Sequence, residues 1–137
     1  TGLASRLLGI EKAEHVVHHP LRGNLFENLV LGELLKYRYN RALPDPFYFY
    51  RDSKGNEVDI IYEIGGLPFP VEIKAGSTLN NDYFRNLRYF LERVAGRNPY
   101  TVSAGLLVYA GNRVELRNDI QVTHPSELSS VLSVLEK

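Results

Sequence analysis

Two acidic side chains and a lysine lie within apolar, strand-like stretches near the middle of the chain. Asp59 ends the run EVD at 57–59, and the run VEIK at 71–74 carries Glu72 and Lys74. Charge inside apolar sequence is costly unless it has a partner or a function. Two carboxylates converging with a lysine can support metal-assisted phosphodiester hydrolysis, because the carboxylates hold Mg²⁺ and the ammonium offsets developing negative charge.

The two runs must pair for these side chains to meet. Side chains alternate between the faces of a strand, so we expect Glu72 and Lys74 on one face and the apolar residues between them on the other. If the runs form an antiparallel hairpin, Asp59 can meet the acid and the amine of the second strand. The alternative is an ordinary ion pair on a solvated face, with Asp59 satisfied by backbone donors or by Arg51.

Helix and strand patterns surround the three charges. Their order predicts an α/β fold, with a mixed central sheet that contains an antiparallel meander and is flanked by helices. The helix over 24–40 has Asn24 as its expected N-cap and Glu27 in a capping box. We expect helices at 3–10, 24–40, 82–95 and from 126, strands at 47–51, 57–64, 70–74, 101–110, 114–116 and 120–122, and a histidine-rich loop at 11–21.

Apolar spacing also predicts which side of the second long helix faces the core. The stripe consists of Phe84, Leu87, Leu91 and Val94, and Gly96 is expected to close the helix.

Several other ionisable residues are candidates with ordinary alternatives. Glu33 is a rival to Glu27 as the acid of the first long helix, and Glu57 shares a strand face with Asp59 or is a surface charge. Three loop histidines suggest zinc, but they lack a fourth ligand, and such histidines are usually solvated. They are His15, His18 and His19.

Basic and aromatic side chains are possible nucleic-acid contacts. The aromatic run at 47–50 lacks clean alternation, which favours core packing on both faces over base stacking. Four basic residues fit either a phosphate-facing rim or a plain solvated face: Arg51, Lys54, Arg85 and Arg88.

Length and composition limit the classes of protein. The 137 residues suffice for one domain with its own core. Sixteen basic and sixteen acidic side chains cancel, so nucleic-acid binding would depend on a local patch. The chain has no cysteine, which excludes disulfides and fits a reducing compartment. Without a membrane-span or signal-peptide pattern, we expect a cytoplasmic protein with no membrane partner.

The charged set resembles the PD-(D/E)xK nuclease superfamily, which has the restriction-endonuclease-like fold. That family places an acid on the first helix, an aspartate on the second strand and (D/E)xK on the third. The matching residues here are Glu27, Asp59, Glu72 and Lys74. The longer stretches GNLFENLVLGELL, FYFYRDSKGNEVDIIYE and VEIKAG are similar to a narrower family, the domain of unknown function that follows the ATPase module in many bacterial and archaeal AAA-type ATPases.

Two features depart from the superfamily pattern. No proline precedes Asp59, and the chain has no GxxxxGK[ST] loop, so ATP binding is not attributed to it. Because the chain begins at Thr1 and contains no methionine, we expect it to be a piece of a longer protein, with an ATPase module on its N-terminal side.

The resemblance implies a divergent nuclease-like, DNA-binding domain that depends on Mg²⁺ or Mn²⁺. Asp59, Glu72 and the Ile73 carbonyl would ligate the metal. Lys74 would orient or activate water, and Glu27 would bridge metal-bound water to the scissile phosphate. The restriction-endonuclease-like core would span 21–137, and 1–20 would be a remnant of a preceding segment with its linker.

A catalytically silent module is the alternative. It would couple the ATPase to a protein or nucleic-acid partner, since the superfamily includes nuclease-like members that bind without cutting. Balanced net charge and few clustered basic residues favour this interpretation.

Overall fold

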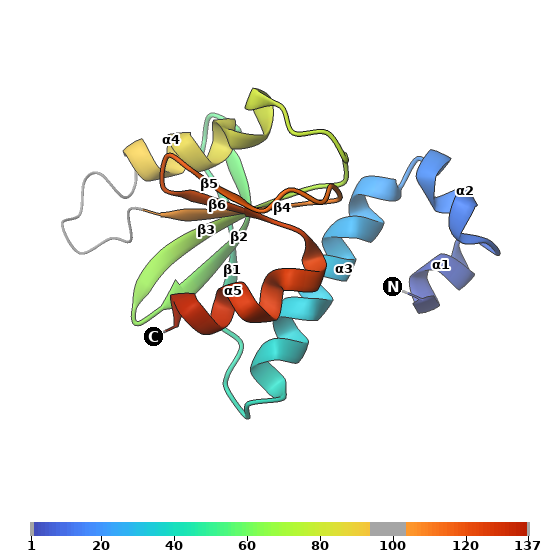
Figure 1. The fold of residues 1–137 in the computed structure, drawn as a ribbon, viewed down its shortest axis with the longest axis horizontal. Coiled ribbons are helices and arrows are strands. Elements are labelled where there is room, and N and C mark those ends of the chain that lie inside the picture. Colours follow the sequence, from blue (N-terminus) through green and yellow to red (C-terminus); the bar gives the residue numbers. More distant parts are fainter. Residues whose placement is uncertain (1, 94–103, 137) are drawn as a thin grey trace.

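A computed structural model describes residues 2–93 and 104–136 (Figure 1). A mixed six-stranded sheet is flanked by helices, which confirms the α/β prediction. The strands are β1 Phe47–Arg51, β2 Glu57–Ile64, β3 Leu67–Lys74, β4 Gly105–Tyr109, β5 Glu115–Arg117 and β6 Ile120–Thr123. The helices are α1 Gly2–Leu7, α2 Ala13–His18, α3 Arg22–Tyr39, α4 Arg85–Arg93 and α5 Leu128–Leu135, with 3₁₀ turns η1 Asn81–Phe84 and η3 Pro125–Glu127.

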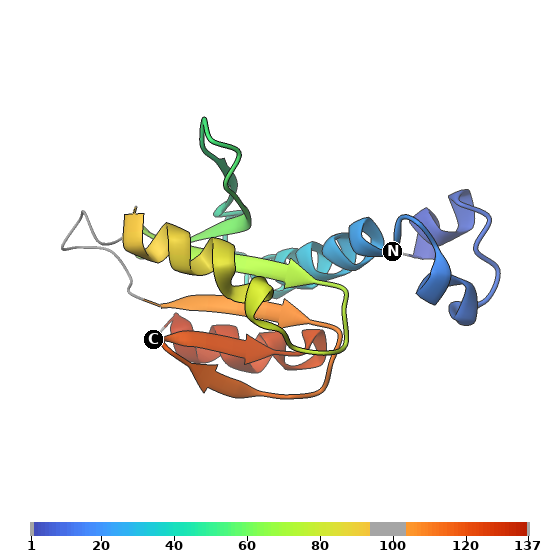
Figure 2. The same cartoon turned by 90° about the horizontal axis from the view of Figure 1, so that it is seen from above.

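The sheet has the order β1-β2-β3-β4-β6-β5. The first three strands form the predicted antiparallel meander, and β3, β4 and β6 are parallel to one another. Every residue of β4 is buried, as expected for a central parallel strand that carries no charge. Figure 2 shows the hairpin of β1 and β2 projecting away from the rest of the sheet.

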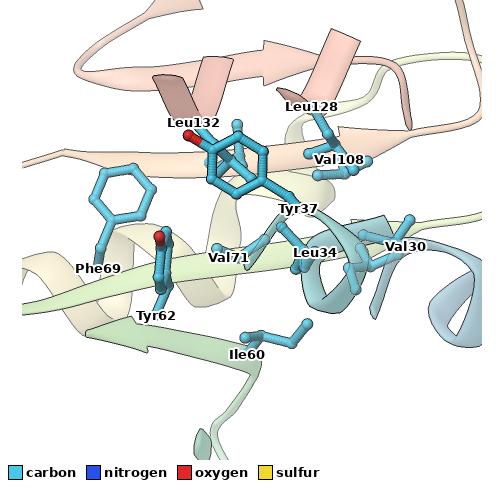
Figure 3. Close-up of a cluster of buried hydrophobic side chains, with 12 residues drawn as sticks. Val30, Leu34, Tyr37, Ile60, Tyr62, Phe69, Val71, Val108, Leu128 and Leu132 are labelled. Carbon is cyan, nitrogen blue, oxygen red and sulfur yellow. The ribbon is translucent and has the colours of Figure 1, made fainter. Parts of the chain in front are cut away.

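Two apolar clusters hold the layers together. The first lies between the sheet and helices α3 and α5, and Figure 3 shows Leu34 and Tyr37 of α3 facing Val71 of β3 within it. The second lies on the opposite face, where Leu87 and Phe90 of α4 pack on the sheet. Each strand of the meander therefore has one face toward α3 and the other toward α4.

Helix α3 begins earlier than predicted, and its N-terminus is not capped by a side chain. Leu21 is the N-cap and makes no side-chain capping bond, while the Leu25 N–H is already bonded to the Leu21 carbonyl. Asn24 thus lies within the first turn, where the backbone satisfies the donors that it was expected to cap. The predicted N-cap and capping box are wrong, which leaves the Glu27 carboxylate without a capping role.

The segment ahead of α3 is more helical than predicted. Residues 13–18 form α2 instead of a loop. Helix α1 ends before Gly9, which adopts a φ of 70° and closes it as expected. Neither short helix buries a residue.

Strand β3 starts at Leu67, before the predicted Pro70. Its prolines pair in register with β2 at Glu63 and Ile61, but the ladder with β4 begins only at Val71. The Ile73 N–H points toward β2 and the Lys74 carbonyl toward β4, so by alternation the nitrogens of Pro68 and Pro70 lie on the β4 side. The missing N–H groups therefore remove no bond from either ladder.

The C-terminal half follows the predicted order with shifted boundaries. The predicted helix 82–95 is the 3₁₀ turn η1 followed by α4. Phe84 of η1 and Leu87 of α4 are buried as predicted, and Phe90 of α4 is buried as well. The predictions for Val94, Gly96 and residues 101–103 fall outside the described residues.

A bulge in β2 displaces the strand at the predicted site. Tyr48 pairs with Ile61 and Tyr50 pairs with Val58, so Asp59 and Ile60 together stand opposite the single residue Phe49. The extra residue puts Val58 and Ile61 on the same α4-side cluster, whereas Ile60 joins the α3-side cluster. Simple alternation, on which the sequence prediction depended, therefore fails at Asp59.

Candidate functional site

Glu72 is the most buried charged residue among those described, with 1% of its surface exposed. Its Oε1 accepts hydrogen bonds from Lys74 Nζ at 2.6 Å and from Asn86 Nδ2 at 2.9 Å. Its Oε2 is also buried and has no hydrogen-bond partner among the described residues. A buried carboxylate oxygen that lacks a partner is costly, which marks this position as more than a structural ion pair.

Asp59 approaches the same lysine from the other face of the sheet. Its Oδ2 accepts the Ile73 N–H at 2.7 Å and lies 3.9 Å from Lys74 Nζ. Regular pairing would place Asp59 opposite Glu72, but the ladder between β2 and β3 stops at the pair of Ile60 and Val71. The bulge turns Asp59 toward α3. The two carboxylates therefore do not share one face of the sheet, and each instead approaches Lys74 Nζ.

Glu27 extends this group from helix α3. It lines a pocket of about 240 Å³ together with Asp59 and Ile73, and its charge interacts with both Asp59 and Lys74. The structure thus brings together the four predicted residues of the charged set: Glu27, Asp59, Glu72 and Lys74.

The electrostatics of the group raise the pKa values of its three acids and of its lysine. Burial, and then the charge of Asp59, raise the pKa values of Glu72 and Glu27. Burial also raises the pKa of Asp59 against the opposing effects of the Ile73 N–H and Lys74. For Lys74, burial alone lowers the pKa, but the three surrounding carboxylates outweigh it and the pKa is raised. Burial is therefore the main cause of the raised carboxyl pKa values, and Lys74 offsets only part of it.

The donors present fit a hard divalent cation. Mg²⁺ is commonly held by one or two carboxylates and keeps several waters, so it does not require a cage of protein ligands. Glu72 offers its unpartnered oxygen and Asp59 lies beside it across Lys74, with Ile73 in the wall of the adjoining pocket. Among residues 2–93 and 104–136, no group of three or more His, Asp or Glu side chains is arranged to hold a metal.

The weaker candidates lie apart from this group. Glu33 pairs with Lys36 on the surface of α3, and Glu57 is exposed, although its charge contributes to the raised pKa of Asp59. The three histidines lie on or just after the exposed α2, and the His19 ring accepts the Leu21 N–H. These contacts give the histidines and Glu33 ordinary structural surroundings.

The predicted basic residues lie mostly on the surface, and the aromatic run is only partly packed into the core. Arg51, Lys54 and Arg85 are exposed, while Arg88 lies over the Phe84 ring. In the aromatic run, Phe47 and Tyr50 pack against the two clusters, as predicted. Core packing is wrong for the middle of the run, because Tyr48 is 58% exposed and Phe49 is 65% exposed.

Sequence reasoning missed two residues of the site. Asn86 on α4 donates to Glu72, and Phe49 on β1 lines the pocket that contains Asp59. Asn86 carried a usable signal, since it is a polar residue beside the predicted core positions of that helix. Phe49 belongs to the aromatic run that the sequence assigned to core packing, and its exposed place in the pocket depends on the bulge in β2.

The chain belongs to the family described as Domain of unknown function (DUF4143), whose model matches residues 22–128. It is similar to an uncharacterized protein of Mycobacterium bovis and to another of Mycobacterium tuberculosis, each 36% identical over 78 residues. The alignment covers 57% of this chain but only 17% of each relative. No solved structure matches the chain. No described helix is long and apolar enough to cross a membrane.

Proposed function

We propose that this chain is a divergent metal-dependent phosphodiesterase domain with a restriction-endonuclease-like core, acting on DNA within an ATPase-linked cytoplasmic protein. The observation that carries the proposal is Glu72, a fully buried carboxylate with an unpartnered oxygen beside Lys74 and Asp59. The link to an AAA-type ATPase module rests on the similarity of the helix and hairpin stretches to the domain that follows such modules.

Asp59, Glu72 and the Ile73 carbonyl would hold Mg²⁺ or Mn²⁺. When bound, such an ion polarises a phosphate and makes hydroxide available near neutral pH. Lys74 is charged and held by Glu72, so its ammonium can orient a water or offset charge on the phosphate oxygens. Glu27, at the exposed side of the pocket, can accept a proton or hold the attacking water.

The contacts of the apo site support a second candidate function. Lys74 and Asn86 already bond one oxygen of Glu72, and the Ile73 N–H satisfies Asp59. Such a site can serve as a structural network in a catalytically silent module that couples an ATPase to a protein or nucleic-acid partner.

Measurements of metal binding and of DNA cleavage distinguish the two candidate functions. We expect wild-type protein to bind Mn²⁺ in calorimetry, to show an anomalous scattering peak between Asp59 and Glu72, and to cleave DNA when Mg²⁺ or Mn²⁺ is added. Asp59→Asn is expected to weaken Mn²⁺ binding by tenfold or more, and Lys74→Ala to abolish cleavage in a folded protein.

The matched control is Lys36→Ala, which removes an exposed lysine that pairs with Glu33 on the same molecule. It should leave both readouts unchanged. Equal cleavage by wild type and Lys74→Ala would refute the catalytic role, and absence of Mn²⁺ binding at millimolar concentration would favour the silent module.

A further inference from the structure

Phe49 is placed at the candidate site by the bulge in β2. It is the single residue of β1 that stands opposite Asp59 and Ile60. Alternation along β1 puts Phe49 on the same face as Phe47, which packs on the α3 side, whereas Tyr50 packs on the α4 side. Phe49 accordingly lines the pocket that Glu27 and Asp59 also line, and at its other edge it borders the shallower hollow that contains Tyr48 and Tyr50.

The ring is an available surface within that pocket. Phe49 is 65% exposed, although its neighbours Phe47 and Tyr50 each pack against another aromatic ring at a centroid distance of 5.0 Å. A scattered exposed aromatic needs no explanation, but this one shares a concave wall with the half-buried Asp59 and with Glu27. A flat apolar ring beside a phosphodiester site suits one ligand group especially well, the π-face of a nucleobase.

Charge decides which nucleic acid this surface suits. Duplex binders gain affinity from many phosphate contacts, but this chain has no net charge, and its exposed basic residues near the hairpin are few, notably Arg51 and Lys54. The bases of a duplex are stacked on one another and offer no free face to the ring. An unpaired strand offers both its bases and its phosphates, so stacking can supply affinity that charge does not.

We propose that Phe49 stacks on a base next to the phosphate that a divalent ion at Asp59 would hold, so that the domain selects single-stranded or locally unpaired nucleic acid. This inference deepens the proposed function and rests on the same site. Tyr48 provides a matched comparison: it is an exposed aromatic on the same strand, but it lies on the opposite face and outside the pocket with Asp59.

The experiment measures binding without cleavage. Fluorescence anisotropy would follow a labelled 12-nucleotide single strand and the matching duplex, in Ca²⁺ and separately in EDTA, with the full chain. We expect the single strand to bind at least about tenfold more tightly than the duplex. Phe49→Ala should weaken single-strand binding by about tenfold to a hundredfold, the range for loss of one stacking ring.

Two variants serve as controls. Phe49→Trp keeps a stacking ring and should keep the single-strand affinity. Tyr48→Ala should change it less than about twofold. Because Phe49 is exposed, its truncation should not alter the melting temperature, which confirms that any loss of binding is local.

Each outcome is decisive. Equal affinity for single strand and duplex, equal losses in Phe49→Ala and Tyr48→Ala, or no binding of either oligonucleotide would overturn the inference. Calorimetry with Mn²⁺ keeps the proposed function separate: metal binding without strand preference refutes only the role of Phe49. Strand preference lost in Phe49→Ala, without metal binding, supports the role of Phe49 and refutes the phosphodiesterase.

Discussion

At the scale of single residues, the candidate site is defined by how many carboxylates share one ammonium. Lys74 neutralises part of the charge of Glu72 and Asp59, yet the pKa values of both acids remain raised because both are buried, and the charge of Asp59 further raises that of Glu72. Ionising both acids therefore costs folding free energy in the absence of a cation. Such a site binds a divalent ion most tightly at a pH where both acids have lost their protons.

We expect the metal-dependent stabilisation of the protein to grow as the pH rises. A raised carboxyl pKa means that the folded state holds its proton above the ordinary range near 4, so metal-free protein loses stability as the pH rises through the raised pKa values. The increment in melting temperature caused by Mn²⁺ should therefore be small at pH 4.5 and larger at pH 8.

Glu72→Gln is the control for this dependence, because it removes one of the two titrating acids and keeps an acceptor for Asn86. It should flatten the fall in metal-free stability and reduce the Mn²⁺ increment at every pH. An increment that stays constant between pH 4.5 and 8 in the wild-type protein would contradict the assignment.

The charged residues that meet in the structure could be found from the sequence, but their orientation could not. Charges at Asp59, Glu72 and Lys74 stand out because apolar residues surround them, and the structure brings the three side chains together. The sequence does not reveal that Asp59 lies on the α3 side of the sheet and Glu72 on the α4 side, with Lys74 within reach of both, because a bulge leaves no local signal in the run EVDII. Phe49 was missed for the same reason.

At the scale of elements, the β1–β2 hairpin is tied to helix α4 through its turn. Asp52 accepts the Asn56 N–H within the turn, and its Oδ2 accepts the Tyr89 hydroxyl of α4 at 2.6 Å. The Tyr89 hydroxyl, followed by Asn56, holds the pKa of Asp52 well below its usual range. The hairpin that carries Phe49 is therefore fixed at its turn as well as along its ladder.

We expect Tyr89→Phe to loosen this attachment. Because the folded-state pKa of Asp52 is depressed, its stabilising contribution is present above the ordinary pKa near 3.9 and is lost as the pH falls. The variant should melt at a lower temperature than wild type at pH 7, and the difference should shrink below pH 3.

Tyr48→Phe is the matched control, since Tyr48 is exposed on the same hairpin. It should melt like wild type at both pH values. A Tyr89→Phe difference that is equally large at pH 7 and below pH 3 would show that the Asp52 bond is not its cause.

Element type was easier to predict than element boundaries. Helix α3 was recognised from periodic apolar residues and β2 was predicted with its observed bounds, whereas β3 was predicted from residue 70 and begins at Leu67. The sequence shows that Pro68 and Pro70 are present but not that the neighbouring strand pairs only beyond them. Helix α2 was missed because its short sequence has no buried face.

At the scale of the whole molecule, the buried residues of the described chain begin in α3. Helices α1 and α2 contribute no buried side chain, and apolar residues such as Leu3 and Leu7 remain exposed on them. In contrast, Leu34 of α3 is fully buried in the cluster between α3, α5 and the sheet.

We expect a variant lacking residues 1–20 to fold with a free energy of unfolding within about 1 kcal/mol of the full chain, because helices α1 and α2 bury little apolar surface. Chemical denaturation measures this difference. Leu34→Ala is the comparison and should cost about 2–5 kcal/mol. A large loss of stability on truncation would move the boundary of the domain ahead of residue 21.

The two prolines of β3 also affect how readily this strand can pair with a strand of another copy of the chain. An edge of a β-sheet that carries free N–H and C=O groups can recruit the strand of a second molecule and seed aggregation. Pro68 and Pro70 present no donor on the side facing away from β2. In a partly folded chain, this stretch of β3 is therefore a poor template for strand addition by other chains, and its prolines cost no pairing within its own sheet.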